Sequence, residues 1–382
     1  MRVLLLHNFL TPYRIPLFEA LARQVELEVW IYGDVASIRE WEHKSEGLPF
    51  KCRLLPHLNL PTGSRDYRIL LNHTLPRELK RHERDVTLCM GWDAPASWYA
   101  AWEARRHKRP FVLWSGSTEN EPSWRRSISK PLVRWIVRGA DARITYGSRA
   151  KDYLVSLGAD PETTWPAVRG LPDAYGAGAR ALPVDARAHQ RGVLGLDARF
   201  VVFYCGQLID RKGLPELLHA FAYFQSGRDD AVLVIAGTGN RERNFRAQAQ
   251  RLGIAHKVRW LGHVPPENLP GWYALADLFV LPSREEVWGM VINEALACGV
   301  PVLTCEPVGA APDLILEGEN GYVVPAGDPA ALHKALLRHF SEDHDRAAMR
   351  RRVLEIGECW SLEHQVEVIV GALRHAISIK TG

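Results

Sequence analysis

The chain has 382 residues, of which 47% are hydrophobic and 24% charged, and its formal net charge is +4. This length predicts about two to three domains, and the apolar content excludes an intrinsically disordered chain. The net charge is too small for a dedicated nucleic-acid-binding protein, and no basic tract coincides with a nucleic-acid motif.

Cysteine spacing and hydropathy favour a cytoplasmic location. The six cysteines are widely spaced and form no C-x-x-C pair, so neither a zinc site nor a disulfide framework is expected. The first apolar run is too short for a signal peptide, and no stretch reaches the ~18 apolar residues of a membrane span. We therefore expect a cytoplasmic protein whose only membrane contact would be peripheral, at the inner face.

Short apolar runs, each followed by a helix-compatible stretch, form two series along the chain. Such alternation is typical of parallel sheets with helices on both faces. The sequence therefore predicts an α/β protein with two doubly wound domains that bind ligands at the carboxyl ends of their strands. The first series comprises residues 3–6, 27–32, 86–90, 111–114 and 144–146, and the second comprises residues 201–205, 232–236, 258–261, 278–281, 301–304 and 322–324.

The first half is rich in tryptophan, with nine of the thirteen lying before Pro172. Aromatic faces stack well on the apolar faces of sugars. Trp92, Trp98, Trp102 and Trp114 fall close to expected strand ends. We expect most of the nine to be core residues and no more than two or three to contact a ligand.

A basic stretch lies late in the first half. Arg126, Lys130, Arg134 and Arg138 recur every four residues among tryptophans and aliphatic residues, a pattern that can lie on an anionic membrane. Pro131 complicates a single helix through this stretch. The alternative is an ordinary surface helix with a solvated basic face.

Residues 172–191 separate the two series and are rich in Ala, Gly, Pro and Arg without apolar periodicity. This composition is typical of a linker. We place the first domain at residues 1–180 and the second at residues 181–362.

A polar loop carrying Arg211 and Lys212 follows the first strand of the second series. At the carboxyl end of a strand, Lys212 could neutralise charge that develops on a leaving phosphate; the alternative is a solvated loop lysine. Residues 236–240 look like a dinucleotide fingerprint, but Glu242 stands in place of its third glycine. We therefore expect a tight strand-to-helix turn near a nucleotide.

Glu286 and Glu294, with seven residues between them, bracket a loop that opens into a helix. Gly289 permits close backbone approach, and the helix-prone run that follows ends at Gly299. The first amides of this helix would face an anion such as a pyrophosphate, while each carboxylate could accept hydrogen bonds from sugar hydroxyls. The alternative is a solvated loop residue and a surface helix residue.

Asp343 and Asp345 have the D-x-D spacing of a metal-dependent sugar-nucleotide site. Ser341 before them makes a helix start the favoured interpretation. No other acidic or histidine cluster has metal-ligand spacing, so no metal is expected.

Together these segments resemble glycosyltransferase family 4, the retaining transferases of GT-B fold that use nucleotide sugars. The resemblance is carried by residues 203–221, 262–283 and 283–302, and more loosely by residues 8–18 and 139–145. It implies two Rossmann-like domains facing across a cleft, with a last helix, at about residues 363–382, that returns to the first domain.

The resemblance also implies roles for individual residues. Lys212 would contact the donor phosphate, Glu286 the transferred sugar and Glu294 the ribose hydroxyls, with a UDP- or GDP-sugar as donor and no separate cofactor. The catalytic candidates are Lys212, Arg211 and Glu286; the donor-binding candidates are Gly206, Gln207, Gly237, Val264, Gly289, Met290, Val291 and Glu294; the acceptor-side candidates are Thr11, Arg14, Trp92, Ser115 and Ser117.

Two departures from the family pattern stand out. Gln207 occupies the position of an arginine, which makes Arg211 the candidate substitute. After the fourth strand, where the family often has a histidine, the chain reads Trp-Ser-Gly-Ser, and whether Ser115, Ser117 or Glu119 takes over that role is open.

We expect a retaining hexosyltransferase that acts on a hydroxyl of a glycan, lipid-linked or small-molecule acceptor. One alternative is a nucleotide-sugar epimerase of the same fold, which would need no acceptor pocket; the Trp-rich first half argues against it. The other is a catalytically silent sugar-nucleotide binding module, which Gln207 and the absent histidine favour.

Overall fold

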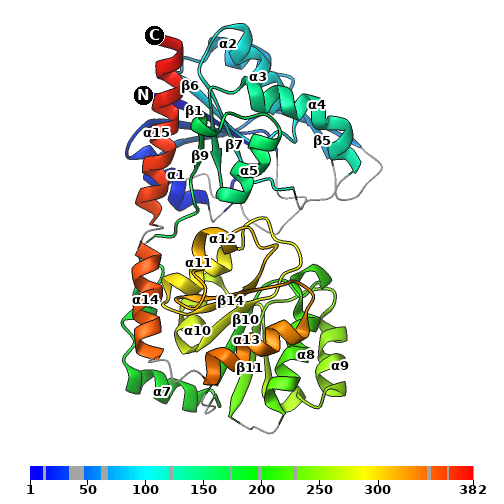
Figure 1. The fold of residues 1–382 in the computed structure, drawn as a ribbon. Coiled ribbons are helices and arrows are strands. Elements are labelled where there is room, and N and C mark those ends of the chain that lie inside the picture. Colours follow the sequence, from blue (N-terminus) through cyan, green and yellow to red (C-terminus); the bar gives the residue numbers. More distant parts are fainter. Residues whose placement is uncertain are drawn as a thin grey trace. The chain divides into compact units, whose positions relative to one another are not determined.

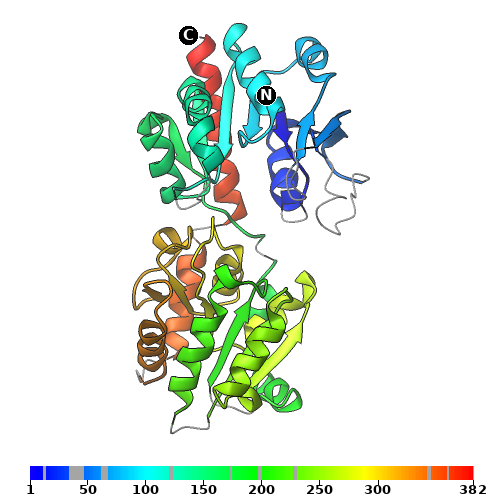
Figure 2. The same ribbon diagram turned by 90° about the vertical axis from the view of Figure 1, so that its right-hand side faces the viewer.

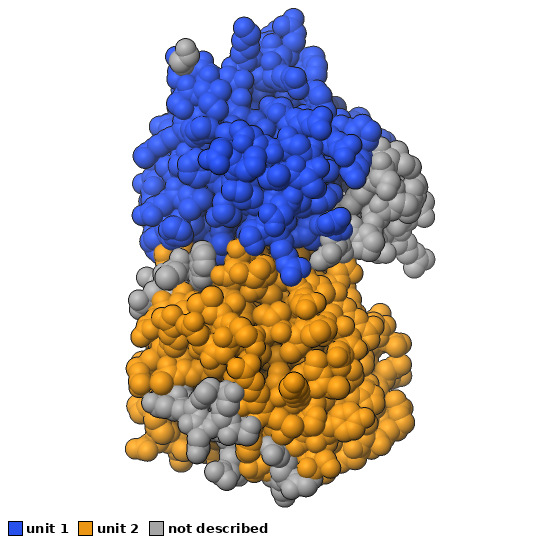
Figure 3. Space-filling view, viewed as in Figure 1, with its two compact units in different colours: residues 1–168, 362–382 blue, residues 169–361 orange. Residues whose placement is uncertain are grey.

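The computed structural model describes residues 1–11, 14–33, 47–61, 68–119, 124–172, 174–196, 200–226, 230–341, 346–358 and 361–381. The chain divides into two compact units (Figure 3). Unit 1 comprises Met1–Val168 and Leu362–Gly382, and unit 2 comprises Arg169–Ser361. Each unit is a parallel sheet with helices on both faces (Figures 1 and 2), which confirms the predicted fold class.

The sheet of unit 1 has the strand order β3-β2-β1-β6-β7-β8-β9, with all neighbours parallel. The five predicted strands are present, and β3, β9 and the antiparallel hairpin β4–β5 were not predicted. The strands are β1 (Arg2–His7), β2 (Glu26–Ile31), β3 (Lys51–Leu54), β4 (Leu58–Pro61), β5 (Arg68–Leu71), β6 (Val86–Met90), β7 (Phe111–Ser115), β8 (Ala142–Thr145) and β9 (Thr164–Pro166).

Alternate residues of these strands pack on opposite faces of the sheet. Leu5 and Val29 face α1 (Ile15–Ala22) and the C-terminal helix α15 (Leu362–Thr381), whereas Leu6 and Leu113 face the other layer. That layer comprises α2 (Leu75–Arg81), α3 (Pro95–Arg106), α4 (Trp124–Gly139) and α5 (Ser148–Ser156).

Helix α4 runs through Pro131 without ending there, although a proline inside a helix is unfavourable. Proline removes one backbone donor and crowds the preceding turn. The buried apolar stripe of Val133, Ile136 and Val137, which packs into the unit 1 core, compensates for that loss. Tertiary packing commonly outweighs local propensity in this way.

The sheet of unit 2 contains all six predicted strands, in the parallel order β12-β11-β10-β13-β14-β15. These are β10 (Phe200–Cys205), β11 (Ala231–Ala236), β12 (Val258–Gly262), β13 (Leu278–Leu281), β14 (Val302–Cys305) and β15 (Gly321–Val324). The helices are α6 (Ala177–Arg180), α7 (Val184–Val193), α8 (Leu214–Gln225), α9 (Glu242–Arg251), α10 (Leu269–Leu275), α11 (Met290–Ala297), α12 (Ala311–Leu314), α13 (Pro329–Ser341) and α14 (Arg346–Glu358).

The stretch predicted as a linker is a folded part of unit 2. Arg187 and Arg191 of α7 form ion pairs with Asp277 at 2.9 and 2.8 Å, and a Cβ added to Gly176 would lie 2.0 Å from the carbonyl oxygen of Ala297. The units divide after Val168, whereas the sequence placed the boundary after residue 180. This stretch is held to unit 2 by ion pairs between arginine and aspartate side chains. Such contacts need no apolar periodicity in the sequence, and its absence is why the stretch was interpreted as a linker.

Gly237 makes the turn between β11 and α9 possible. Its φ is +136°, and an added Cβ would lie 1.9 Å from the carbonyl oxygen of Gly206 at the end of β10. Both the dihedral and the space therefore require glycine. The turn has the form that the sequence predicted.

We expect Gly237→Ala to destabilise unit 2 by more than about 1 kcal/mol, since it adds a steric clash to an unfavourable φ. Thermal unfolding of the purified variant measures the change. The matched control is Gly253→Ala, because Gly253 also has a positive φ, +72°, but nothing lies within 4 Å of an added Cβ. Equal losses in both variants would show that the close approach to Gly206 contributes nothing.

Candidate functional site

The predicted donor-side residues gather at the carboxyl edge of the unit 2 sheet. The strand order reverses between the neighbours β10 and β13, and open α/β sheets bind ligands beside such a reversal. The loop after β10 carries residues 206–212, and the loop after β13 carries residues 283–289. The two loops are joined by a 2.8 Å hydrogen bond from the Arg284 amide to the Arg211 carbonyl.

Lys212 and Glu286 face each other from these two loops and form an ion pair. Their side chains are only 12% and 15% exposed, so Lys212 is not a solvated loop lysine. Lys212 ends the 3-10 turn Asp210–Lys212, and the next residue, Gly213, has a φ of +70°. A Cβ on Gly213 would lie 1.9 Å from the Pro282 carbonyl oxygen, so the backbone beside Lys212 is tightly packed.

Helix α11 begins next to this ion pair. Gly289 is its N-cap with a φ of +96°, and Gly299, with a φ of +74°, follows its last turn. The first amides of the helix, those of Met290 and Val291, have no acceptor within the helix. Because a helix N-terminus carries partial positive charge, it and the Lys212 ammonium together form a favourable place for an anion.

Backbone hydrogen bonds hold the loop that carries Glu286. Glu286 pairs with Val308 in a short parallel bridge. The Gly309 amide donates to the Glu286 carbonyl at 3.1 Å, and the Ala310 amide donates to the Trp288 carbonyl at 2.9 Å. The loop that carries Glu286 follows β13, and residues that follow β14 hold it in place. Both segments therefore determine where the Glu286 carboxylate lies.

Glu294 lies inside the protein and not on a helix surface. Glu294 lies in the second turn of α11, and the residue is 4% exposed. The Tyr273 hydroxyl donates to its carboxylate at 3.0 Å. Burial raises the pKa of Glu294, and the hydrogen bond from Tyr273 opposes that rise.

A second tyrosine lies near the same carboxylate. The Tyr175 hydroxyl is buried without a partner at hydrogen-bond geometry, and burial and the charge of Glu294 together raise the pKa of this phenol. Burial likewise raises the pKa of the neighbouring Cys205 and Cys298 thiols to about 12. Nothing in the sequence marked Tyr175 or Tyr273, because their proximity to Glu294 depends on how α10 and residues 174–176 pack.

We expect the buried carboxylate of Glu294 to make unit 2 less stable as pH rises. The pKa of this group is higher in the folded protein than its ordinary value of 4.5. Between the two values the folded state binds the proton that the unfolded state has released, so stability falls with rising pH. Glu294→Gln should remove that part of the slope in a series of thermal unfolding curves. A slope unchanged by the substitution would contradict the assignment to Glu294.

The remaining donor-side candidates lie at the same edge. Gln207 is exposed, and its carbonyl accepts a 3.0 Å hydrogen bond from the Tyr204 hydroxyl. Arg211 is also exposed, and its Nη1 donates to the Glu285 carbonyl at 3.1 Å. Val264, Gly206, Met290 and Val291 are partly buried.

The acceptor-side candidates lie at the carboxyl edge of the unit 1 sheet. Arg14 is buried, and its amide donates to the Thr11 carbonyl at 2.9 Å. Ser115 is buried at the end of β7 and accepts a 3.2 Å hydrogen bond from the Ser117 amide. Glu119 is exposed.

The tryptophans near strand ends divide into core and surface residues. Trp114 and Trp92 are buried. Trp98 and Trp102 on α3 are 36% and 48% exposed, and the Trp98 indole N–H donates to the Trp92 carbonyl at 2.6 Å. Trp98 and Trp102 are therefore exceptions to the expectation that most tryptophans of the first half are core residues.

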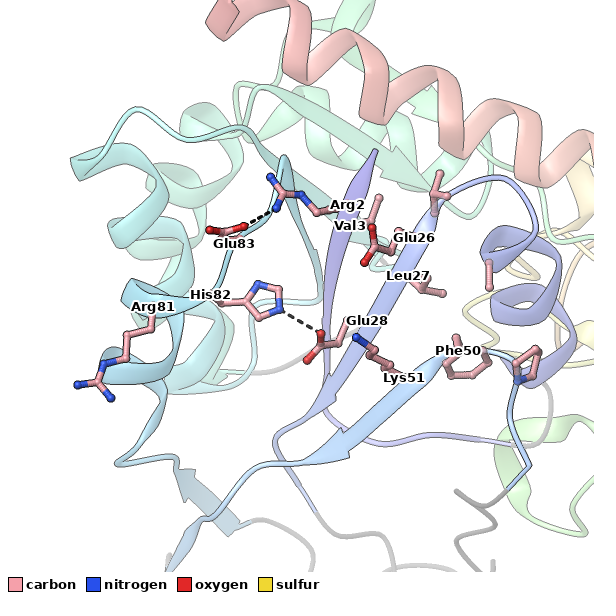
Figure 4. Close-up of a pocket in the computed structure, with 13 residues that line it drawn as sticks. Arg2, Val3, Glu26, Leu27, Glu28, Phe50, Lys51, Arg81, His82 and Glu83 are labelled. Atoms are coloured by element: carbon pink, nitrogen blue, oxygen red, sulfur yellow. Dashed lines mark hydrogen bonds and ion pairs between the residues drawn. The ribbon is translucent and has the colours of Figure 1, made fainter.

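A pocket of about 610 Å³ lies in unit 1 away from these candidates (Figure 4). Its lining includes Arg2, Glu26 and Lys51, the first residues of β1, β2 and β3, so it lies at the amino edge of the sheet. Within the lining, Arg2 forms an ion pair with Glu83 at 2.7 Å, and the His82 Nε2 lies 3.1 Å from the Glu28 carboxylate. We assign it no role in the chemistry.

Among the described residues, no group of three His, Cys, Asp or Glu side chains could hold a metal ion. The D-x-D segment at Asp343 and Asp345 lies outside those residues. In the same part of the chain, no helix is both long and apolar enough to cross a bilayer.

Two Rossmann-like units with a charged site at a strand-order reversal define an α/β enzyme of the GT-B class. The family model for glycosyl transferases group 1 matches residues 187–355. The structure of Anabaena HepE in complex with UDP aligns with a TM-score of 0.77 and 20% identity, and the alignment covers 98% of this chain and 100% of that one.

Curated relatives support the same conclusion. A GDP-mannose-dependent alpha-(1-6)-phosphatidylinositol monomannoside mannosyltransferase from Mycolicibacterium smegmatis is 30% identical over 302 residues, which is 76% of each chain. A D-inositol 3-phosphate glycosyltransferase from Corynebacterium urealyticum is 31% identical over 304 residues, which is 75% of this chain and 68% of that protein. The chain belongs to the group 1 glycosyltransferases, and the resemblance to family 4 is confirmed.

Proposed function

We propose that this glycosyltransferase moves a hexose from a nucleotide diphosphate sugar to a hydroxyl of a glycan, lipid-linked or small-molecule acceptor, with retention of anomeric configuration. The observation that carries the proposal is the Lys212–Glu286 pair beside the N-terminus of α11, at the strand-order reversal of unit 2. A cation and helix amides suit a diphosphate, and a carboxylate suits sugar hydroxyls.

The chemistry follows from where charge develops. As the bond to the sugar breaks, negative charge grows on the departing diphosphate, and Lys212 and the first amides of α11 would oppose it. Glu286 would orient the sugar by accepting hydrogen bonds from its hydroxyls. No nucleophilic side chain is assigned, because attack by the acceptor hydroxyl on the face that the diphosphate leaves would retain the configuration without one.

The names of the relatives support a choice of donors to test first. The Mycolicibacterium smegmatis relative is named for GDP-mannose, and the Anabaena HepE structures contain UDP, UDP and glucose, or UDP-glucose. A buried carboxylate such as Glu294 would bind a ribose in either donor. We therefore propose a GDP- or UDP-hexose.

A donor panel with and without acceptor, read by nucleotide release, tests the proposal. Acceptor-dependent release supports transfer, and the anomeric coupling constant of the product reports retention. An isomerised donor without transfer would indicate an epimerase instead. Binding without turnover for every donor and acceptor would indicate a silent module.

We also propose that the enzyme reaches a membrane-linked acceptor through peripheral contact at the cytoplasmic face. Lys130, Arg134 and Arg138 are exposed on α4, while the side chains of Trp124 and Arg126 lie outside the described residues. Helix α3, which packs against α4, exposes Trp98 and Trp102. Basic side chains beside exposed aromatic residues are typical of interfacial contact.

Co-sedimentation with vesicles tests this contact. The enzyme is expected to bind anionic vesicles at low salt and to dissociate at high salt, since each basic residue contributes on the order of 1 kcal/mol. Changing Arg126, Lys130, Arg134 and Arg138 to glutamine should abolish binding. A control with the exposed Arg243, Arg251, Lys334 and Arg352 changed to glutamine should bind like the parent. No binding by the parent at low salt would favour a soluble acceptor.

A further inference from the structure

A buried arginine at the carboxyl edge of the first sheet has no carboxylate partner among the described residues. Arg14 is 7% exposed. Its Nη2 donates to the Tyr146 hydroxyl, and its Cζ lies 5.4 Å from the centre of the Trp114 ring and 5.0 Å from that of Tyr146. Since a guanidinium stays protonated in proteins, a permanent cation lies against two neighbouring aromatic side chains.

Aromatic contacts alone do not offset the burial of this charge. A cation–π contact stabilises a cation by much less than the removal of that ion from water costs. The Arg14 Nη1 is buried without a hydrogen-bond partner. The Trp114 indole nitrogen in the same cluster is also buried without one. Both N–H groups lack an acceptor, and one of them belongs to a cation, so the pair is complementary to an anion with several acceptor oxygens.

In Arg84 and Arg143, two other arginines of unit 1 with buried guanidinium groups, every guanidinium nitrogen donates to an acceptor, which sets Arg14 apart. Arg84 donates to Glu103 and to Thr87, each at 2.7 Å. Arg143 donates to the Val137 carbonyl at 2.7 Å and to the Thr163 hydroxyl at 2.6 Å. Those two arginines stabilise the fold through their hydrogen bonds, whereas the Nη1 of Arg14 has no acceptor.

The position of Arg14 suits a ligand. Arg14 follows β1, which neighbours β6 where the strand order of the unit 1 sheet reverses, and such a reversal is where α/β sheets bind ligands. The local backbone is adapted to the cluster, because a Cβ on Gly116 would lie 1.8 Å from the Tyr146 ring. Glycine at this position lets the ring lie against the loop after β7.

We propose that Arg14 binds a phosphate group of the acceptor, so that the enzyme selects phosphorylated over neutral polyols. The inference rests on the proposed function, in which unit 1 binds the acceptor. Phosphate is preferred because a guanidinium and an indole N–H can each donate to a different phosphate oxygen. The phosphate would displace the groups that now cover Nη1. Its source is either a free polyol phosphate or a lipid head group.

Calorimetric titration of the full chain without donor tests the proposal. The soluble probes are D-inositol 3-phosphate, myo-inositol and inorganic phosphate, and vesicles containing phosphatidylinositol test the lipid source. Arg14→Gln should weaken binding of the phosphate-bearing probes at least about tenfold, the loss typical of a charge-assisted hydrogen bond, and leave myo-inositol unchanged. Arg23→Gln, on the exposed end of the same helix, should bind every probe like the parent.

Two further variants keep the test decisive if Arg14→Gln does not fold. Arg14→Lys keeps the charge but loses the planar pair of donors, so it should bind phosphate probes more weakly than the parent. Tyr146→Phe frees Nη2 and should keep the preference for phosphate. Equal affinity of folded Arg14 variants for phosphate, or a parent that binds no phosphate probe, would overturn the proposal. A failure of sugar transfer itself appears separately, as absent nucleotide release.

Discussion

Lys212→Ala is expected to lower kcat by about 100- to 1,000-fold, the range found when one charge-stabilising group is removed from an active site. Its effect on donor affinity should be smaller, because the charge that the ammonium opposes grows only as the diphosphate leaves. Single-turnover rates and donor Kd values, measured separately, give the two quantities. Equal losses in binding and in rate would indicate a contact made already in the ground state.

The Lys212–Glu286 ion pair calls for a second comparison. Removing the ammonium also leaves Glu286 without its cation, so part of the loss could come from a displaced carboxylate. A double-mutant cycle with Glu286→Gln separates these effects. If Lys212 acts on the diphosphate directly, it should remain costly to remove in the Glu286→Gln background. Lys334→Ala, at an exposed position on α13, is the control and should retain the parent rate.

Glu294→Ala is expected to weaken nucleotide binding by about 1.5 to 3 kcal/mol, or roughly 10- to 100-fold in Kd, because a charged acceptor of ribose hydroxyls is lost. The comparison should be made with deoxyribose nucleotides as well. The parent should bind these more weakly than the ribose forms, and the variant should no longer distinguish them. Calorimetry gives all four dissociation constants.

Two controls separate recognition from folding in the Glu294 experiment. Glu294→Gln keeps the shape of the side chain and still accepts the Tyr273 hydroxyl, so it should stay folded. Glu319→Ala removes an exposed glutamate of the same unit and should bind like the parent. A folded Glu294→Ala variant with unchanged affinity would show that the ribose lies elsewhere.

The strands of unit 2 could be predicted because burial makes them continuous apolar runs. Every residue of β11, β13 and β14 is buried, so these strands stand out against any neighbouring pattern. In unit 1, β3 is mostly exposed, and β9 has only three residues. Such strands form because they pair with a neighbouring strand, and the local sequence pattern does not reveal that pairing.

The sequence predicted those parts of the candidate site that depend on residues close together in the chain. The spacing of Glu286 and Glu294 placed a loop and a helix start correctly, and the basic loop placed Lys212 at a strand end. The Tyr273 and Tyr175 hydroxyls near Glu294 could not be predicted, since they come from α10 and from the stretch interpreted as a linker. Arg14 was named, but its unsatisfied donor became visible only with Trp114 and Tyr146 in place.

The division of the chain makes unit 2 an insertion within unit 1. Unit 2 is the single continuous segment Arg169–Ser361, and its two ends adjoin each other, because Leu171 pairs with Ser361 in a parallel bridge. Unit 2 should therefore be expressible by itself. A short linker between residues 168 and 362 should restore an unbroken unit 1. Conversely, one proteolytic cut near either end of unit 2 would leave the two units covalently joined.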